Sequence, residues 1–199
     1  MTSESGCRII GTGKSGAGNP RGCEVPEGKV ASMNIAIIGA SGGIGAFIRD
    51  EALVRGHRVT AIVRHPEKIA VKDPRLRVVK ADILKDTVDR LVKGHDAVIS
   101  AYNAGWSNPD IYSEQIEGYR RIIGGVKKSG IKRLLVVGGA GTLEVAPGVR
   151  VLDTATFSEQ VKKGVLATAE VLSMLKEEKG LEWTFLSPPS SIKPGERTG

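Results

Sequence analysis

The 199-residue sequence has few aromatic residues, and this scarcity limits how its core can be built. Phe, Trp and Tyr together make up 4% of the chain, whereas hydrophobic residues of all kinds make up 40%. We therefore expect a core of Ile, Val, Leu and Ala, a composition that suits a parallel sheet covered by helices. The length suits one well-buried domain, because two independent cores would leave each part small.

Cysteines and long apolar runs are also scarce. Cys7 and Cys23 both precede the region of regular apolar patterns, so the expected core contains no disulfide. No apolar run approaches the roughly 20 residues that a membrane-spanning helix needs, and the N-terminus lacks the apolar stretch of a secretory signal. These features predict a cytoplasmic protein without a membrane partner.

The formal net charge of +7 is not concentrated in a dense basic run. Basic residues occur as pairs, such as Lys127-Lys128 and Lys162-Lys163, and acidic residues are interleaved elsewhere. This pattern favours a solvated surface over nucleic-acid binding. No group of His, Cys, Asp and Glu has metal-ligand spacing, so we expect no metal site. The sequence gives no indication of the oligomeric state.

The first part of the chain differs in composition from the rest. Residues 1–32 are rich in Gly, Ser, Pro and Glu and lack periodicity, which predicts a disordered extension before a domain over 33–199. Residues 11–15 imitate the end of a phosphate-binding P-loop, but Arg8 stands where the motif requires its first glycine. We interpret this match as coincidental.

Apolar runs of strand length alternate with helical periodicity from Asn34 onward. This alternation predicts a single α/β domain with a Rossmann-type, doubly wound parallel sheet. The expected strands are Asn34–Ile38, Arg58–Val63, Leu76–Lys80, Ala97–Ser100, Arg133–Val137 and Glu182–Leu186. The expected helices span 43–56, 87–93, 113–129 and 158–179. Their inward residues should include Ile44, Ile48, Ala52 and Leu53 in the first helix and Val161, Val165, Leu166, Ala169, Leu172 and Leu175 in the last.

A glycine-rich turn, GASGGIG, joins the first strand to the first helix. Gly39 permits the tight turn, Gly42 lets the backbone approach a pyrophosphate, and Gly45 lets helix and strand pack closely. The N–H groups at the helix N-terminus attract anions. Such a turn can also be merely compact, but its position between a buried strand and an amphipathic helix favours dinucleotide binding.

The second strand is followed by arginine instead of an acidic residue. Arg64 lies 64 − 45 = 19 residues after Gly45, where an NAD-specific site usually offers Asp or Glu to the ribose. A guanidinium there binds the 2′-phosphate of NADP(H), and His65 and Lys68 lie beside it. The alternative is an ordinary surface arginine. We predict NADP(H) as the preferred cofactor, with NAD(H) as the second possibility.

Several linked segments together resemble the atypical short-chain dehydrogenase/reductases. The resemblance covers 33–199 and is carried by MNIAIIGASGGIGAFIRDEALVRGHRVTAIVRHPEK, VKADI, DAVISAYNAGW, RLLVVGGAGTLEVAPGV and WTFLSPPSSIKPGERTG. Within this group the chain is similar to bacterial NAD(P)H-binding proteins provisionally named NADH-flavin reductases. It is more distantly similar to biliverdin reductase B and to NmrA-like proteins.

The resemblance also implies positions for cofactor contacts after the later strands. It places Asp82 and Ile83 near the adenine and Ser187-Pro188-Pro189 near the nicotinamide, although Asp82 as a helix cap and the others as ordinary turn residues are alternatives. The expected cofactor-binding residues are Gly39, Ser41, Gly42, Gly43, Ile44, Gly45, Arg64, Asp82, Ile83, Ser100, Ala101, Tyr102, Gly138, Gly139, Ser187 and Pro188.

Two features depart from related proteins. The Tyr-x-x-x-Lys pair of ordinary short-chain dehydrogenases is absent, because Tyr102, Tyr112 and Tyr119 lack a lysine four residues later. Members of the group also continue past GERTG, so we expect a domain truncated at its C-terminus and a substrate pocket that lacks a wall. The catalytic residues stay unassigned.

The expected function is an NADPH-dependent oxidoreductase that passes hydride to a small flavin or quinone-like acceptor. A non-catalytic NADP(H)-sensing regulator of NmrA-like type requires the same cofactor cleft and is the alternative. A sugar-nucleotide epimerase or dehydratase is disfavoured by the missing Tyr-x-x-x-Lys pair.

Overall fold

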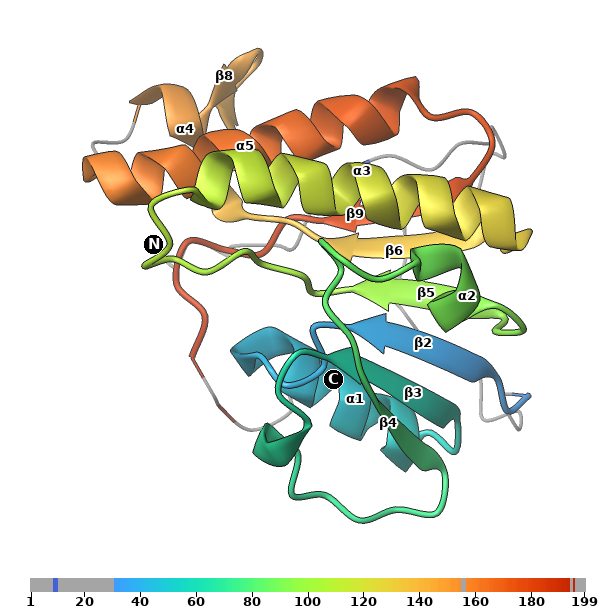
Figure 1. Cartoon of the computed structure of the whole chain (residues 1–199). Coiled ribbons are helices and arrows are strands. Elements are labelled where there is room, and N and C mark those ends of the chain that lie inside the picture. The colour runs from blue at the N-terminus through green and yellow to red at the C-terminus, as the bar shows by residue number, and fades with distance from the viewer. Residues whose placement is uncertain (1–8, 11–30, 155–156, 194, 196–199) are drawn as a thin grey trace.

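A seven-stranded sheet forms the centre of the fold (Figure 1). The computed structural model describes residues 9–10, 31–154, 157–193 and 195. Six parallel strands match the predicted ones: β2 (Asn34–Ile38), β3 (Arg58–Val63), β4 (Leu76–Lys80), β5 (Ala97–Ser100), β6 (Arg133–Val137) and β9 (Glu182–Leu186). Their order is β9-β6-β5-β2-β3-β4, which confirms the Rossmann-type α/β sheet.

The chain reverses its progress across the sheet between β2 and β5. Strand β2 pairs in parallel with β3 on one side and with β5 on the other. From β2 the chain moves outward through β3 and β4, then returns to β5 and continues through β6 and β9. The carboxyl ends of β2 and β5 therefore flank the switch point, where open α/β sheets bind their ligands.

The four predicted helices are present, with ends displaced by one or two residues. They are α1 (Gly43–Val54), α2 (Val88–Val92), α3 (Ile111–Ser129) and α5 (Glu159–Glu177). The larger apolar core lies between the sheet and α2, α3 and α5, and a smaller one lies between the sheet and α1. Figure 1 shows α3 and α5 lying side by side. Both sheet faces are thus buried, which explains the nearly continuous apolar strands.

The inward face of α5 differs from the predicted stripe. Val161 and Leu166 are 37% and 39% exposed, so the prediction that they face the core is wrong. The buried positions include Gly164 and Ala167 instead. A Cβ on Gly164 would lie 2.9 Å from the Ile111 side chain of α3, so close helix packing selects small residues here. The periodicity of large apolar residues in the sequence therefore does not identify the inward face of α5.

Small elements between β6 and α5 were not predicted. They are a 3₁₀ turn η2 (Ala140–Thr142), a hairpin of β7 (Glu144–Ala146) and β8 (Val149–Arg150), and helix α4 (Val151–Thr154). A second 3₁₀ turn, η1 (Pro66–Lys68), follows β3. These elements are too short for periodicity to reveal them.

The N-terminal segment is described at few positions. Ile9–Ile10 form β1, which pairs antiparallel with Leu186 and Phe185 of β9, although the sequence predicted no strand there. Both cysteines and the P-loop-like residues 11–15 lie outside the described residues. The disordered extension over 1–32 otherwise stays a prediction.

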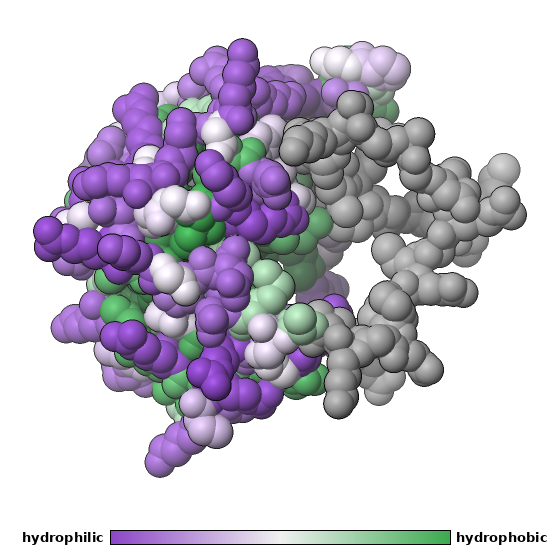
Figure 2. Space-filling model, turned by 90° about the vertical axis from the view of Figure 1, so that its right-hand side faces the viewer, coloured by the Kyte–Doolittle hydropathy of each residue, from purple (hydrophilic) through white to green (hydrophobic). Residues whose placement is uncertain are grey.

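The surface carries mainly hydrophilic side chains on the face shown in Figure 2, with smaller hydrophobic areas between them. No helix in the described residues combines the length and apolar character needed to cross a bilayer. The cytoplasmic location and the absence of membrane and nucleic-acid partners stay predictions.

Candidate cofactor and acceptor cleft

The glycine turn after β2 is held in a shape that its first residue must allow. Gly39 has a φ of +81°, its N–H donates to the Ile62 carbonyl at 3.0 Å, and its carbonyl accepts from the Gly42 N–H at 3.0 Å. A Cβ on Gly39 would lie 2.6 Å from the Ala101 carbonyl oxygen. The expected tight turn is therefore present, and both conformation and space require glycine.

The other glycines of the turn divide into packed and open positions. A Cβ on Gly45 would overlap the Gly39 carbonyl, so helix α1 packs directly against the turn. A Cβ on Gly43 would meet no atom within 4 Å, and one on Gly42 would only touch the Gly39 oxygen at 3.4 Å. Gly42 is also the N-cap of α1 and makes no side-chain cap. Open backbone at an uncapped helix N-terminus fits an anion such as a pyrophosphate.

Two cavities meet at this turn and at the segment after β5. The larger encloses about 650 Å³ and the smaller about 220 Å³. Residues that line both are Gly42, Ala101, Tyr102 and Asn103. The cavities together therefore form one cleft along the carboxyl ends of the strands, with the glycine turn at its middle.

The smaller cavity, which we call the cofactor end, carries positive charge. Arg64, His65 and Lys68 line it, together with the apolar side chains of Ile62 and Ile83. Arg64 is exposed, and no carboxylate of the described residues pairs with it. His65 differs, because its Nδ1 lies 3.0 Å from the Glu67 carboxylate. An apolar wall beside a free guanidinium suits an adenosine that carries a phosphate.

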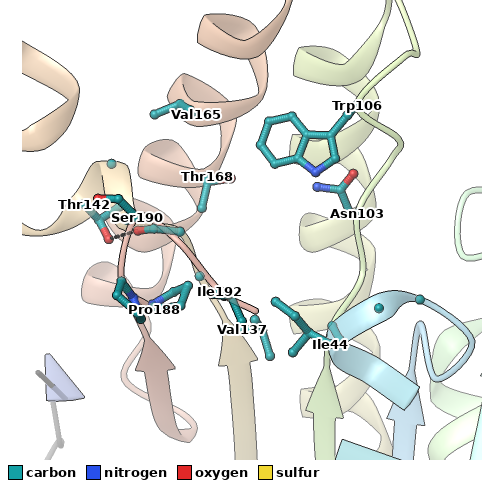
Figure 3. Close-up of a pocket in the computed structure, with 18 of the residues that line it drawn as sticks. Ile44, Asn103, Trp106, Val137, Thr142, Val165, Thr168, Pro188, Ser190 and Ile192 are labelled. Atoms are coloured by element: carbon teal, nitrogen blue, oxygen red, sulfur yellow. Dashed lines mark hydrogen bonds between the residues drawn. The ribbon is translucent and has the colours of Figure 1, made fainter. Parts of the chain in front are cut away.

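The larger cavity, which we call the acceptor end, lies between α1, the end of β6, helix α5 and the segment after β9. In Figure 3, Ile44 faces it from α1, Val165 and Thr168 from α5, and Pro188 and Ile192 from the last segment. Ile44 is 37% exposed, so it forms part of the cavity wall and is not buried in the core as the helical periodicity predicts.

The glycines after β6 have a packing reason of their own. A Cβ on Gly138 would overlap the Phe185 ring, and one on Gly141 would overlap Val165. One on Gly139 would lie 3.3 Å from Thr168. Close packing against β9 and α5 thus explains these glycines without a cofactor, although Gly138 and Gly139 do line the acceptor end.

Tyr102 lines both ends of the cleft from the segment after β5. It is 8% exposed, and its ring meets Tyr119 edge to face with centroids 5.8 Å apart. Its hydroxyl donates to the Glu114 carbonyl at 3.4 Å. Burial raises the pKa of Tyr102 to about 12, and the charge of Arg64 acts in the opposite direction. The phenol is therefore protonated at neutral pH.

Ser100, Ser187 and Asp82 are the predicted contacts that line neither cavity. Ser100 is fully buried and donates to the Tyr119 hydroxyl at 3.3 Å. Ser187 is 1% exposed, with its Oγ 2.7 Å from the Thr142 Oγ1. Both serines are therefore buried beneath the cleft, where they bind Tyr119 and Thr142 instead of facing the cavities.

Asp82 takes part in a local turn. Its Oδ1 accepts from the Leu84 N–H at 3.0 Å, and its own N–H donates to Asp86 at 2.7 Å. The N-cap of the following helix α2 is Thr87, so Asp82 does not cap that helix as the alternative interpretation expected. Contact of Asp82 with the adenine stays a prediction.

Many residues of the acceptor end were not identified from sequence. Most follow the ends of β5, β6 and β9 or lie on α5: Asn103, Trp106, Gln115, Val137, Ala140, Gly141, Thr142, Val151, Phe157, Val165, Thr168, Ser190 and Ile192. Position after a strand end was the available signal for several of them. The sequence pattern assigns Val165 to the core, because helical periodicity does not separate a cavity wall from a packed face.

A glutamine on α5 fastens the segment that carries Trp106. The Gln160 Nε2 donates to the Trp106 carbonyl at 3.1 Å and to the Asn108 carbonyl at 2.6 Å. The indole lies over Gly164, where a Cβ would come within 2.6 Å, and it is 52% exposed. Figure 3 shows Trp106 and Asn103 on the opposite side of the cavity from Pro188. Gln160 thus holds one wall of the acceptor end.

The chain is similar to known proteins over most of its length. YwnB of Bacillus subtilis is 38% identical over 170 residues, which cover 84% of this chain and 77% of that protein. A Bacteroides thetaiotaomicron structure with the provisional name epimerase is 48% identical, has a TM-score of 0.76, and covers 84% of this chain and 76% of its own.

A second solved structure carries a different name. It comes from Streptococcus pneumoniae, is provisionally called an NADH-flavin reductase, and is 37% identical with a TM-score of 0.68, over 84% of this chain and 77% of its own. The sequence model of the NAD(P)H-binding family matches residues 39–199. The chain therefore belongs to the NAD(P)H-binding family of atypical short-chain dehydrogenase/reductases.

Proposed function

We propose that this protein is an NADPH-dependent reductase whose acceptor is a flavin or a quinone-like compound. The observation that carries the proposal is the single cleft, which has cations at one end, an uncapped helix N-terminus at its middle and a roomy apolar cavity at the other end. A dinucleotide offers phosphates for the first two regions and a nicotinamide for the third. The Streptococcus relative with a flavin reductase name supports the acceptor class.

The residues present fit NADPH in three ways. Open backbone at Gly42 and Gly43 leaves room for a pyrophosphate, Arg64 offers a guanidinium to a 2′-phosphate, and Ile83 offers an apolar contact to adenine. When bound, the cofactor supplies a hydride. The chain itself binds, orients and shields the two reactants.

The acceptor end offers little proton chemistry. Among the described residues that line this cavity, Tyr102 is the one with an ionisable side chain. Its hydroxyl already donates to the Glu114 carbonyl, and its pKa is raised to about 12. A ketone that accepts hydride develops alkoxide charge, which a positioned acid must neutralise. A flavin or quinone spreads the charge over a conjugated ring and takes its proton from water. This contrast supports the proposed acceptor class.

The test is NADPH and NADH oxidation against flavins, quinones and simple ketones, with NADP⁺ reduction by secondary alcohols as the reverse-direction control. We expect NADPH to be oxidised by flavins and quinones and not by simple ketones. Robust ketone reduction would contradict the proposal. Tight NADPH binding without oxidation by any acceptor would instead favour the NADP(H)-sensing regulator.

A further inference from the structure

Charge is distributed very unequally along the cleft. Arg64, His65 and Lys68 all line the cofactor end. At the acceptor end, no described residue of the lining is Asp, Glu, Lys, Arg or His. An anionic group that enters the acceptor end would therefore lose water without meeting a cation, which is strongly unfavourable.

Two threonine side chains of the acceptor end are occupied within the chain. Thr168 donates to the Gly164 carbonyl at 2.9 Å, and Thr142 lies within hydrogen-bond distance of both the Gly139 carbonyl and Ser187.

Gln115 is occupied at both ends of its amide. Its oxygen accepts from the Ala104 N–H at 2.8 Å, and its Nε2 donates to the Tyr102 carbonyl at 3.5 Å. Thr142, Thr168 and Gln115 thus have few hydrogen atoms left for a phosphate, which needs several donors. The other polar side chains of the described lining, Asn103, Trp106 and Ser190, offer neutral donors and no charge.

The nearest basic residues in sequence do not supply the missing cation. Arg150 precedes the lining residue Val151, but its guanidinium is held by Asp153, with Nη2 to Oδ1 at 2.9 Å and Nε to Oδ2 at 3.0 Å. Lys193 follows the lining residue Ile192, is exposed and does not line the cavity.

We infer that the acceptor end selects uncharged conjugated rings, namely quinones and phosphate-free flavins, over phosphorylated flavins. The inference rests on the proposed function, because it assigns this cavity to the acceptor. Apolar walls at Trp106, Val165 and Ile192 favour the ring itself, and the lack of a cation among the described lining residues disfavours the phosphate.

The sharpest test compares riboflavin with FMN, which share one ring system and differ by a phosphate. Binding to the full chain is measured by flavin fluorescence at fixed ionic strength and saturating NADP⁺, so that neither flavin occupies the cofactor end. We expect riboflavin to bind at least about tenfold more tightly than FMN. A second pair, 1,2-naphthoquinone and its 4-sulfonate, should follow the same order. Equal or tighter binding of the anionic compounds, or no binding of either uncharged compound, would overturn the inference.

A designed cation should reduce the selectivity. Ser190 is an exposed lining residue, so Ser190→Lys should strengthen FMN binding about three- to tenfold and leave riboflavin unchanged. Ser173→Lys adds the same charge at an exposed position of α5 outside the lining and should change neither. Lys193→Gln should also change neither, and selective loss of FMN binding in that variant would show that Lys193 serves the phosphate and would overturn the inference.

Turnover in the same samples separates the two proposals. Equal NADPH-dependent turnover of riboflavin and FMN would contradict the proposed selectivity and support the proposed reductase activity. Selective binding of the uncharged compounds without turnover would support the selectivity and contradict the reductase.

Discussion

The two ends of the cleft are built by different means. The turn at its middle and the cofactor end depend on backbone shape, since Gly39, Gly42 and Gly45 each occupy a place that a side chain would disturb or block. The acceptor end depends on side chains from several separate segments. A required backbone shape appears in the sequence as glycines at fixed spacing, whereas a cavity wall of varied apolar residues produces no recognisable sequence pattern. Variants in the two regions should therefore fail in different ways.

The largest effect should come from Gly45→Ala. The added Cβ would overlap the Gly39 carbonyl, which is backbone and cannot rotate aside. We expect the free energy of unfolding to fall by about 2–4 kcal/mol in urea denaturation. Gly43→Ala is the matched control in the same helical turn, because its Cβ meets nothing and alanine favours helix. Equal destabilisation by both substitutions would break the distinction between packed and open glycines.

Gly42→Val should separate cofactor binding from folding. The backbone of Gly42 is extended, at φ −76° and ψ 168°, so valine fits the conformation, but its side chain would enter both cavities. We expect NADPH binding to be lost by more than about a hundredfold, with helix content preserved. Fluorescence titration and circular dichroism measure the two quantities. Unchanged NADPH affinity would remove the glycine turn from the site.

Arg64→Ala should weaken NADPH by about 1–3 kcal/mol and leave NADH nearly unchanged. The reason is that Arg64 lines the cofactor end without a carboxylate partner among the described residues, so its guanidinium is available to a 2′-phosphate. Arg64→Lys should retain part of the preference, because it keeps the charge and loses the planar fork. Dissociation constants for both cofactors decide the matter, and equal losses would mean that Arg64 does not read the 2′-phosphate.

The sheet was predictable mainly from its central strands, since the edge strand β4 has no buried residue. Strands such as Asn34–Ile38 are buried on both faces, so their apolar runs stand out from the sequence. Helix α5 was predictable in extent, but its inward face was not. That face depends on Gly164 and Ala167, whose small size matters only once α3 is packed against it.

The site was predictable where the chain must adopt a special backbone. Gly39 and Arg64 follow their strands at positions that the fold itself defines, and both line the cleft. Trp106 and Val165 lie far apart in the sequence, and only the packing of α5 against the segment after β5 brings them to one cavity. Ser100, the last residue of β5, and Ser187, directly after β9, are buried and line neither cavity, so their contact with a cofactor stays a prediction.

Gln160→Met should change the acceptor end and spare the cofactor end. The substitution keeps the length of the side chain but removes the hydrogen bonds to the Trp106 and Asn108 carbonyls. We expect the KM for the acceptor to rise about three- to tenfold, with the Kd of NADPH unchanged. Glu159→Met, on the preceding exposed residue of α5, should change neither. A change in NADPH affinity as large as that in KM would show that the two ends are not separate.

The smallest effect on chemistry should come from Tyr102→Phe, although this residue lines both ends. With a pKa of about 12, the phenol stays neutral and gives no titration between about pH 6 and 9. Its hydroxyl donates to the Glu114 carbonyl, so its removal costs a weak hydrogen bond and leaves the ring in place.

The pH dependence of folding gives the same substitution a second readout. The pKa of Tyr102 is raised by burial above its unfolded value near 10, so its contribution to stability is full below about pH 10 and is lost as the pH rises toward 12. The phenylalanine variant should lose less stability in that range, while its pH–rate profile with a quinone matches the parent between about pH 6 and 9. A carbonyl reduction whose pH dependence disappears in Tyr102→Phe would instead identify the phenol as a proton donor, because only a group that delivers the proton ties the rate to its own ionisation.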